Sequence, residues 1–318
     1  MDGVPDQFER EYRGSEKEIS ESLKHTFANK KLQQEKNIMI LLDFSQVMIG
    51  TFMALGRGTV VVEEDLLRHT VLNTVRTYKN QFKDAYDNGG LIICCDSKDN
   101  WRKESFPEYK ANRKTKRETD TTDWKSLFEF LAEMIEDFRV HFPYKVMKID
   151  RAEADDIIGV LTKECRVGAT IIISSDKDFI QLQKYEGVRQ WSPLKKDYIS
   201  DNPVESLYEK IIRGDTGDGV PNILSSDDVL ITEGKRQTPI TKKKLDAWRG
   251  KSPEEFCTGD MLRNYHRNKT MVDLRETPNS IRINIINQFN EQSPVHGKLM
   301  NYFIEKKLKN LMEYVGDF

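Results

Sequence analysis

The chain has few of the residues that mark zinc-binding, redox or secreted proteins. Its 318 residues include four cysteines and five histidines, and no two cysteines have the CxxC spacing of a zinc or redox site. No apolar run approaches the roughly 18 residues that span a bilayer, and residues 1–18 contain no apolar core like that of a secretory signal. We therefore expect a cytoplasmic protein with reduced cysteines and no membrane partner.

Charge is abundant but unevenly distributed. Asp, Glu, Lys and Arg make up 32% of the residues, and the formal net charge is −2. Between Lys98 and Arg117, however, eight basic residues stand against three acidic ones. Trp101, Phe106 and Tyr109 are interleaved with these cations, a mixture typical of single-strand nucleic-acid binding. The alternative is a solvated charged loop.

Five short apolar runs predict strands that are buried on both faces of a mostly parallel sheet, at 38–44, 91–96, 144–150, 170–176 and 187–191. Between them lie stretches with helical spacing, at 64–87, 124–140, 153–166 and 177–184. This alternation predicts an α/β fold in which helices flank a central sheet.

The character of the sequence changes near residue 201, where strand signals fade. Helical patterns follow at 204–213, 241–249, 254–265, 281–291 and 298–314. We therefore predict an N-terminal tail (1–36), an α/β domain (37–200) that includes the basic segment 98–122, and a helical region (201–318).

Acidic residues gather where the predicted strands end. Asp43, Asp96 and Asp176 each close an apolar run, and the carboxyl ends of neighbouring parallel strands lie about 4.8 Å apart. Each one alone could simply cap a helix. The turn at 151–156 adds three acids, of which Glu153 and Asp156 share a face in ideal helical geometry. Further acids follow in two loops: Asp178, Asp215 and Asp218.

So many carboxylates require cations, because two of them 5 Å apart repel by about 3 kcal/mol at an effective dielectric of 20. Oxygen ligands without histidine or cysteine favour Mg²⁺ or Mn²⁺, and two such ions suit phosphodiester hydrolysis. Aspartate-nucleophile phosphatases need a second aspartate two residues after the first, but Ser45 occupies that position. No GxxxxGK[ST] loop for a nucleoside triphosphate is present.

Six motifs appear in a characteristic order: LLDFSQ (41–46), CDSKDNWRKESFPEYKANR (95–113), AEADD (152–156), SSDKDFIQL (174–182), QWSP (190–193) and GDTGDGVPN (214–222). This series resembles the 5′-nuclease superfamily of flap endonucleases, 5′-exonuclease domains of bacterial DNA polymerases and phage 5′-nucleases. The greatest likeness is to the ribonucleases H of T-even-type phages, which implies a phage origin.

The resemblance implies two metal ions. Five acids would surround the first: Asp43, Asp96, Glu153, Asp155 and Asp176. Three would serve the second, often through waters: Asp178, Asp215 and Asp218. For the acid-rich turn the family favours Asp155 beside Glu153, whereas ideal helical spacing favours Asp156, so Asp156 also stays in the predicted ligand set.

The basic segment 98–122 matches the family's arch, a mobile segment over the active site, and we call it the arch. By resemblance, Lys110 and Arg113 are the catalytic pair that draws the scissile phosphate onto the metal ions. Tyr109 would stack on an unpaired base, and Arg102 and Lys103 would contact phosphates.

The segment 207–222 resembles the family's helix–three-turn–helix element, in which backbone amides of Gly214, Gly217 and Gly219 would hold duplex phosphates. The second glycine-rich hairpin of most members is replaced by 225–244. Its cations either grip phosphates or are ordinary surface residues: Lys235, Arg236, Lys242, Lys243 and Lys244.

We predict a monomeric, Mg²⁺-dependent, structure-specific 5′-nuclease that uses water as nucleophile, with Mn²⁺ able to replace Mg²⁺. Its substrates would be branched or nicked DNA and RNA–DNA duplexes with a 5′ end or flap. The implied task is removal of RNA primers and flaps during lagging-strand synthesis. The alternatives are a PIN-type ribonuclease and a non-catalytic replisome-assembly protein.

Sliding-clamp and single-strand-binding-protein partners are a further hypothesis. It rests on the position and expected exposure of the segments 1–36 and 311–318.

Overall fold

The computed structural model describes residues 38–56 and 63–318, so the predicted tail lies outside the described residues. A six-stranded sheet has the strand order β3-β2-β1-β4-β5-β6. The predicted mostly parallel sheet is confirmed, with five parallel strands: β1 (Met39–Asp43), β2 (Leu91–Cys95), β3 (Lys145–Lys148), β4 (Thr170–Ile173) and β5 (Val188–Ser192). The sequence did not predict β6 (Asp197–Ile199), a short strand that pairs antiparallel with β5 at the edge.

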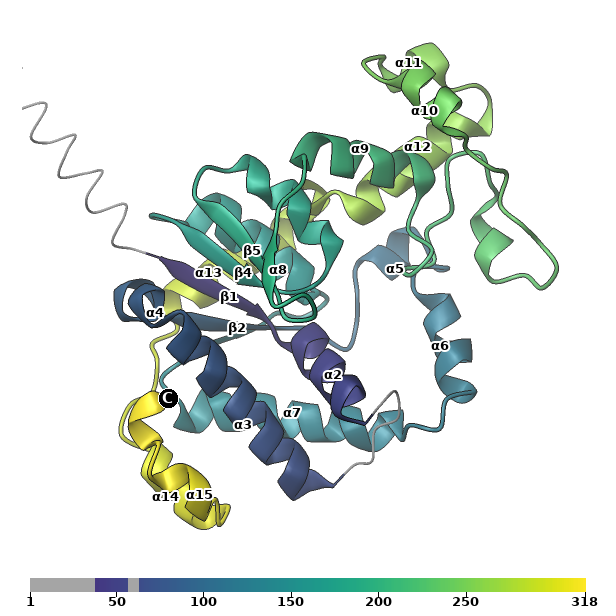
Figure 1. Cartoon of the computed structure of the whole chain (residues 1–318). Coiled ribbons are helices and arrows are strands. Elements are labelled where there is room, and N and C mark those ends of the chain that lie inside the picture. Colours follow the sequence, from purple (N-terminus) through teal and green to yellow (C-terminus); the bar gives the residue numbers. More distant parts are fainter. Residues whose placement is uncertain (1–37, 57–62) are drawn as a thin grey trace, which may run out of the picture.

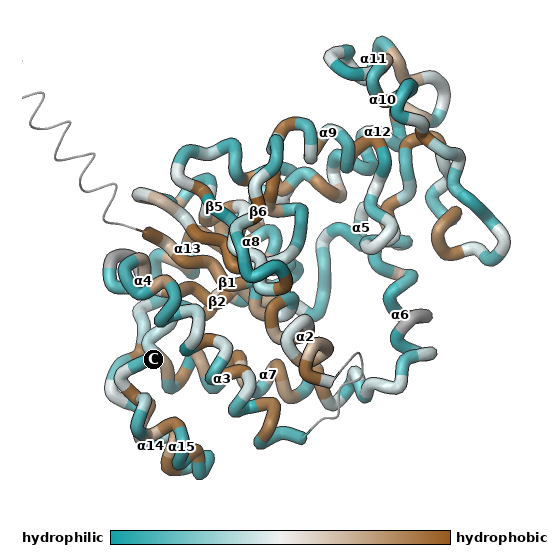
Figure 2. Tube along the Cα trace, in the orientation of Figure 1, coloured by the Kyte–Doolittle hydropathy of each residue, from teal (hydrophilic) through white to brown (hydrophobic). Residues whose placement is uncertain are grey.

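The central strands have apolar side chains on both faces. Ile40 and Leu42 of β1 lie in one hydrophobic core, whereas Leu41 lies in the other. Successive residues of a strand point to opposite faces, so a strand covered on both sides needs apolar residues at every position. Figure 2 shows these strands as a hydrophobic centre. Cys94 and Cys95 are buried in opposite cores and both are free thiols.

Helices cover both faces of the sheet (Figure 1). Those on the first face are α2 (Phe44–Leu55), α3 (Glu64–Gln81), α4 (Lys83–Gly89), α7 (Trp124–His141), α14 (Leu299–Glu305) and α15 (Lys309–Met312). Those on the second are α8 (Ala154–Val160), its π-helical continuation η1 (Leu161–Cys165), the 3₁₀ segments η2 (Lys177–Lys184) and η4 (Leu274–Glu276), and α13 (Asn279–Glu291).

Two differences from the predicted helices have simple causes. The sequence did not predict α2, because FSQVMIGTFMAL (44–55) is apolar almost throughout and gives little contrast between faces. The predicted helix 64–87 is broken at Phe82, which ends α3 and precedes α4. No helix among residues 38–56 and 63–318 is both long and apolar enough to cross a bilayer.

The helical C-terminal region leaves the sheet and then returns to it (Figure 1). Near the sheet, α9 (Pro203–Arg213) packs against α12 (Asp260–Val272). Between them the chain projects outward through η3 (Asp227–Leu230), α10 (Lys242–Trp248) and α11 (Pro253–Phe256). At the end of the chain, α14, α15 and η5 (Val315–Asp317) lie beside the first core. The segment 311–318 buries Leu311 and Phe318 there, so these two apolar side chains are not exposed for a partner.

The arch contains α5 (Arg102–Ser105) and α6 (Ala111–Glu118), which lie beyond the carboxyl ends of the strands (Figure 1). Trp101, Phe106 and Tyr109 are buried, and the last two belong to a small core with Ile211 and Met271. The first half of the arch is therefore packed against the body of the protein and is not a solvated loop. By contrast, α6 is hydrophilic (Figure 2).

Candidate metal centre and arch

The three strand-end acids lie at the carboxyl edge of the sheet, and all three cap helices. Asp43 and Asp176 are the N-cap residues of α2 and η2, and each accepts a backbone N–H from the first turn, at 3.3 and 2.9 Å. Asp96 accepts the backbone N–H of Ala154, the first residue of α8, at 2.9 Å. These hydrogen bonds therefore fix the directions of the three carboxylates at the sheet edge.

The negative charges of neighbouring acids raise the pKa values of Asp43 and Asp155. Burial, followed by the charges of Asp96 and Asp176, raises the pKa of Asp43 to about 8. Burial, followed by Asp176 and Asp43, raises the pKa of Asp155 well above its ordinary range. Burial raises the pKa of Asp176 as well. Asp43, Asp96, Asp155 and Asp176 are thus linked by their charges, and we call these four acids the strand-end group.

The three acids of the turn at 151–156, Glu153, Asp155 and Asp156, have different surroundings. Glu153 is the N-cap of α8 and has an extended backbone, so the ideal helical spacing that pairs it with Asp156 does not apply. Asp156 instead turns back and accepts the Glu153 N–H at 3.0 Å in a capping box. Asp155 belongs to the strand-end group by the charges of Asp176 and Asp43 that act on it, and its role as a metal ligand stays a prediction.

Asp156 was included in the predicted set of metal ligands, but its carboxylate is already paired within the protein. Its carboxylate is 0% exposed and forms a bidentate ion pair with Arg102, at 2.9 and 3.0 Å. Arg102 is itself 1% exposed, so the predicted phosphate contact is not available to it. A buried guanidinium and a buried carboxylate satisfy each other here, and neither is free for a ligand.

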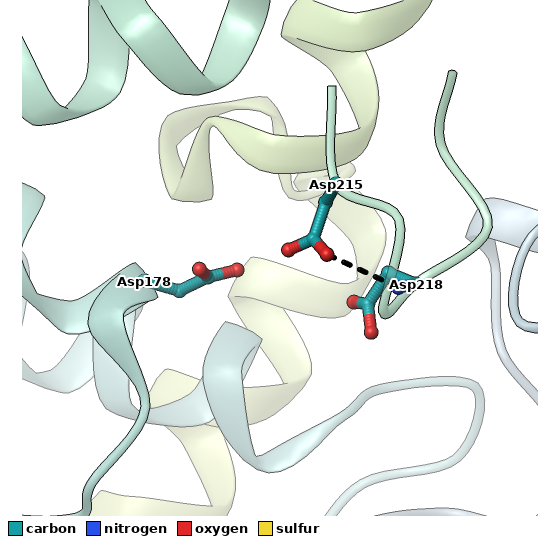
Figure 3. Close-up of side chains that lie close together, drawn as sticks. All are labelled: Asp178, Asp215 and Asp218. Carbon is teal, nitrogen blue, oxygen red and sulfur yellow. Dashed lines mark hydrogen bonds between the residues drawn. The ribbon is translucent and has the colours of Figure 1, made fainter. Parts of the chain in front are cut away.

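A second cluster consists of Asp178, Asp215 and Asp218, whose nearest carboxylate oxygens all lie within 4.8 Å of one another (Figure 3). We call it the turn group. Asp215 accepts the backbone N–H of Gly217 at 2.8 Å and that of Asp218 at 3.2 Å, which fixes the turn. The Lys210 ammonium lies 2.7 Å from an Asp215 oxygen and also pairs with Asp178.

The base of the arch contacts both acidic regions. Lys110 donates to Glu153 at 2.5 Å and lies 3.5 Å from Asp218, while Arg113 donates to Asp218 at 2.5 Å. Burial alone would raise the pKa of Asp218, but Lys110, Arg113 and Lys210 lower it overall. The predicted catalytic pair therefore lies beside the candidate metal ligands.

Two other arch residues differ from each other. Tyr109 is 2% exposed, and its hydroxyl lies 2.8 Å from Glu153 and 3.0 Å from Asp218, so its ring is not open for stacking on a base. This corrects the expected role of Tyr109. Lys103 is exposed and remains available for the predicted phosphate contact.

The glycine-rich turn is already hydrogen-bonded within the chain. The N–H groups of Gly214, Gly217 and Gly219 donate to Lys210 O, Asp215 Oδ1 and Thr216 O. Their predicted contacts with phosphate are therefore not preformed. Gly219 has a φ of +73°, and a Cβ there would lie 2.9 Å from the Glu108 carbonyl oxygen, so this glycine lets the turn pack against the arch.

The atypical segment 225–244 also has internal ion pairs. Lys235 pairs with Asp228 in η3. Arg236 and the three lysines at the start of α10, Lys242, Lys243 and Lys244, are exposed. Their role in nucleic-acid binding stays a prediction.

Two family models match the chain. The N-terminal resolvase-like domain of 5′-3′ exonucleases matches residues 38–210, and the C-terminal domain of T4 RNase H matches residues 202–318. The ribonuclease H of enterobacteria phage T4 is 32% identical over 297 residues, which cover 89% of this chain and 96% of the T4 protein. The chain belongs to the 5′-3′ exonuclease family. It is therefore a nuclease, as predicted from the motifs.

Other relatives and solved structures agree with this assignment. The flap endonuclease Xni of Shewanella piezotolerans is 28% identical over 138 residues, 39% of this chain and 49% of that protein. The fold is similar to that of T5 5′-exonuclease with bound zinc ions (TM-score 0.57, 19% identity) and of the T5 D15 flap endonuclease in a pseudo-enzyme–product complex with DNA and metal ions (0.56, 18%). Each comparison covers 88% of this chain and 99% of the other.

The nuclease has a ligand set that suits a divalent metal ion. The strand-end group offers only carboxylate oxygens, and burial and mutual repulsion hold the pKa values of Asp43 and Asp155 high. A hard cation would relieve that repulsion. Lys210 was missed in the sequence, because a basic residue in the last turn of a helix is ordinary and gives no signal of a role beside the acids.

Proposed function

We propose that this nuclease is a Mg²⁺-dependent, structure-specific 5′-nuclease that hydrolyses phosphodiester bonds with two metal ions. Its substrates are branched or nicked DNA and RNA–DNA duplexes with a 5′ end or flap. Its task is removal of RNA primers and flaps during lagging-strand replication. The observation that carries the proposal is the pair of acidic groups at the sheet edge: neighbouring acids raise the pKa values of Asp43 and Asp155, and the carboxylate oxygens of Asp178, Asp215 and Asp218 lie within 4.8 Å of one another.

The residues of the chain divide into two ligand sets. The first ion would be held by the strand-end group, with Glu153 beside it, and the second by the turn group. When bound, the ions lower the pKa of a coordinated water and stabilise the charge that develops on the leaving oxygen. Asp156 is left out of both sets, because its carboxylate is enclosed by Arg102 and other donors.

The arch supplies positive charge for the substrate. Lys110 and Arg113 pair with Glu153 and Asp218 in the described structure. A scissile phosphate close to the two acidic groups would compete for both cations, because charge-assisted hydrogen bonds to phosphate are strong. Lys110 and Arg113 would then hold the phosphate in line with the attacking water.

Binding to nucleic acid is proposed to depend mainly on backbone phosphates. The T5 D15 flap endonuclease, which has a similar fold, was solved with DNA and metal ions. In the present chain, Lys103 and the exposed cations of α10 are candidate contacts. Such contacts make affinity fall steeply with salt and give little base preference.

The test is cleavage of a duplex with a single-stranded 5′ flap, labelled at either end in turn. The protein is incubated with Mg²⁺, with EDTA, and as Asp155→Asn in Mg²⁺. The matched control is Asp87→Asn, an exposed acid of α4 that pairs with Lys83. We expect cleavage by the wild type and by the control in Mg²⁺ only, and loss of cleavage in Asp155→Asn.

Product lengths separate exonuclease from flap endonuclease activity, and an RNA-primed substrate tests primer removal. Binding without cleavage in both Mg²⁺ and Mn²⁺ would defeat the proposal and favour an assembly role. Cleavage of single-stranded RNA without any need for a duplex would instead favour the PIN-type alternative.

A further inference from the structure

A buried guanidinium connects the arch to the acid-rich turn. Arg102 is 1% exposed although it belongs to a basic segment. Its Nη1 and Nη2 atoms donate to the two oxygens of Asp156 at 3.0 and 2.9 Å, and its Nε donates to the Met271 carbonyl oxygen at 2.9 Å. Nη1 also lies 3.3 Å from Glu153 Oε2. The guanidinium therefore joins α5, α8 and the end of α12.

The partner carboxylate is equally constrained. Asp156 is 0% exposed and accepts from Trp101 Nε1 at 3.1 Å, from Thr277 Oγ1 at 2.9 Å and from the Glu153 N–H at 3.0 Å, in addition to Arg102. The guanidinium carbon of Arg102 lies 4.6 Å from the centre of the Trp101 ring. A charged pair with this many directed partners has a single geometry.

We propose that Arg102 and Asp156 are positioning residues, which set the direction of Glu153 and of the first turn of α8. Both side chains are buried and pair with each other, so neither offers a free group to a metal ion or a phosphate. They act on a residue that does, since Glu153 is held at its N–H by Asp156 and at Oε2 by Arg102. This inference rests on the proposed function and adds two residues to it.

The same connection extends to the arch. Glu153 Oε2 lies 2.8 Å from the Tyr109 hydroxyl, and Glu153 Oε1 lies 2.5 Å from Lys110 Nζ. Movement of Arg102 would therefore displace Glu153 and, through it, the catalytic pair. Lysine at position 102 would keep the charge but lose the planar fork that engages Asp156 through two nitrogens.

The experiment compares Arg102→Lys with the matched control Arg139→Lys. Arg139 is a partly exposed residue of α7, a helix of the first face, and it pairs with Glu136 at 2.6 Å. Three measurements are made on each full-length protein: the kinetics on the 5′-flap duplex, which give kcat and KM, the Mn²⁺ affinity by calorimetry without DNA, and the melting temperature in EDTA.

For Arg102→Lys we expect kcat to fall by about 10- to 100-fold and Mn²⁺ to bind about tenfold more weakly, as for other residues that hold metal ligands in place. KM should stay within about threefold of the wild-type value, because the exposed phosphate contacts are unchanged. The control should match the wild type in all three measurements. A folded Arg102→Lys with unchanged kcat and unchanged Mn²⁺ affinity would overturn the proposal, even if its melting temperature fell.

A second variant covers the case in which Arg102→Lys fails to fold. Thr277→Val removes one hydrogen bond to Asp156 and leaves the ion pair intact, and we expect it to lower kcat by about threefold to tenfold. An unchanged kcat in Thr277→Val would then overturn the proposal. Measurements on the wild type distinguish failure of the proposed function from failure of the positioning role. A wild type that does not cleave defeats the proposed function, whereas the Mn²⁺ titration still tests the positioning role.

Discussion

The two acidic groups at the sheet edge differ in how their charge is balanced. Among residues 38–56 and 63–318, no lysine or arginine nitrogen lies within ion-pair distance of Asp43, Asp96, Asp155 or Asp176. In the turn group, by contrast, Lys210 pairs with Asp178 and Asp215, and Lys110 and Arg113 pair with Asp218.

The pKa values follow this difference. Burial and the neighbouring acids raise the pKa of Asp43 to about 8, whereas nearby cations lower that of Asp218 despite its burial. Carboxylates without protein cations depend on a metal ion for neutralisation, while carboxylates paired with lysine can remain ionised without one. We infer that the strand-end group binds a metal ion more tightly than the turn group, because Lys210 competes for the oxygens of the turn group.

The largest expected effect comes from removing a charge in each group in turn. Asp43→Asn should lower kcat by roughly 1,000-fold, since a metal ion supplies several kcal/mol of transition-state stabilisation. Asp215→Asn should cost less, and raised Mg²⁺ should recover part of its activity. Initial rates on the 5′-flap duplex over a range of Mg²⁺ concentrations give kcat and its Mg²⁺ dependence for both variants. If the two variants lost kcat equally and had the same Mg²⁺ dependence, the two acidic groups would not differ in metal affinity.

Lys210→Met is expected to have a smaller effect, which is on metal affinity. This variant removes the competing cation and keeps the aliphatic part of the side chain. The turn group should then bind Mn²⁺ about fivefold to tenfold more tightly, because an ammonium near the ion no longer repels it. The metal-free protein should be less stable, because Asp178 and Asp215 lose their partner. Calorimetric titration with Mn²⁺ and melting in EDTA check these two outcomes. Weaker Mn²⁺ binding would mean that Lys210 supports the metal site and does not compete with it.

A pH experiment sharpens the same comparison. The folded pKa of Asp43, about 8, lies above its ordinary value of 3.8, so the folded protein holds the proton more tightly than the unfolded chain. The stability from this group is therefore present at low pH and is lost as pH rises toward 8. In EDTA the melting temperature should fall between about pH 4 and about pH 8, the ordinary and folded pKa values of Asp43, and Asp43→Asn should flatten that fall. Excess Mg²⁺ should oppose it, because the ion binds the ionised carboxylate. A wild-type melting temperature that is independent of pH in EDTA would contradict the raised pKa.

The sequence predicted the sheet well, because the periodicity of buried strands depends only on local residue types. It missed α2, whose residues are apolar on nearly all sides, and β6, which has three residues. It also predicted that Asp43, Asp96 and Asp176 lie at one edge of the sheet, since the carboxyl ends of parallel strands share one edge, whereas their role as metal ligands stays a prediction.

Individual side-chain roles were harder to predict, because they depend on backbone details at single residues. The extended backbone of Glu153 at the N-cap, and not its spacing from Asp156, decides that Asp156 turns back into a capping box. Likewise, the sequence predicted Arg102 and Tyr109 to be exposed members of a basic, aromatic segment. Arg102 is buried by its contacts with α8 and α12, and Tyr109 by its packing against Ile211 and Met271. Burial of this kind has no local sequence pattern.

The smallest expected effect lies outside both acidic groups, in the lysines of α10. Replacing Lys242, Lys243 and Lys244 with alanine should leave kcat unchanged, since these exposed residues lie on a segment that projects away from the sheet (Figure 1). If they contact duplex phosphates, the dependence of log affinity on log salt should become shallower by up to about 0.9 per lost contact. Affinity for a long and a short duplex, measured from low to high salt, separates the two possibilities. A shallower slope on the long duplex alone would place the duplex along α10, and an unchanged slope on both would make these lysines ordinary surface residues, leaving phosphate binding to the arch.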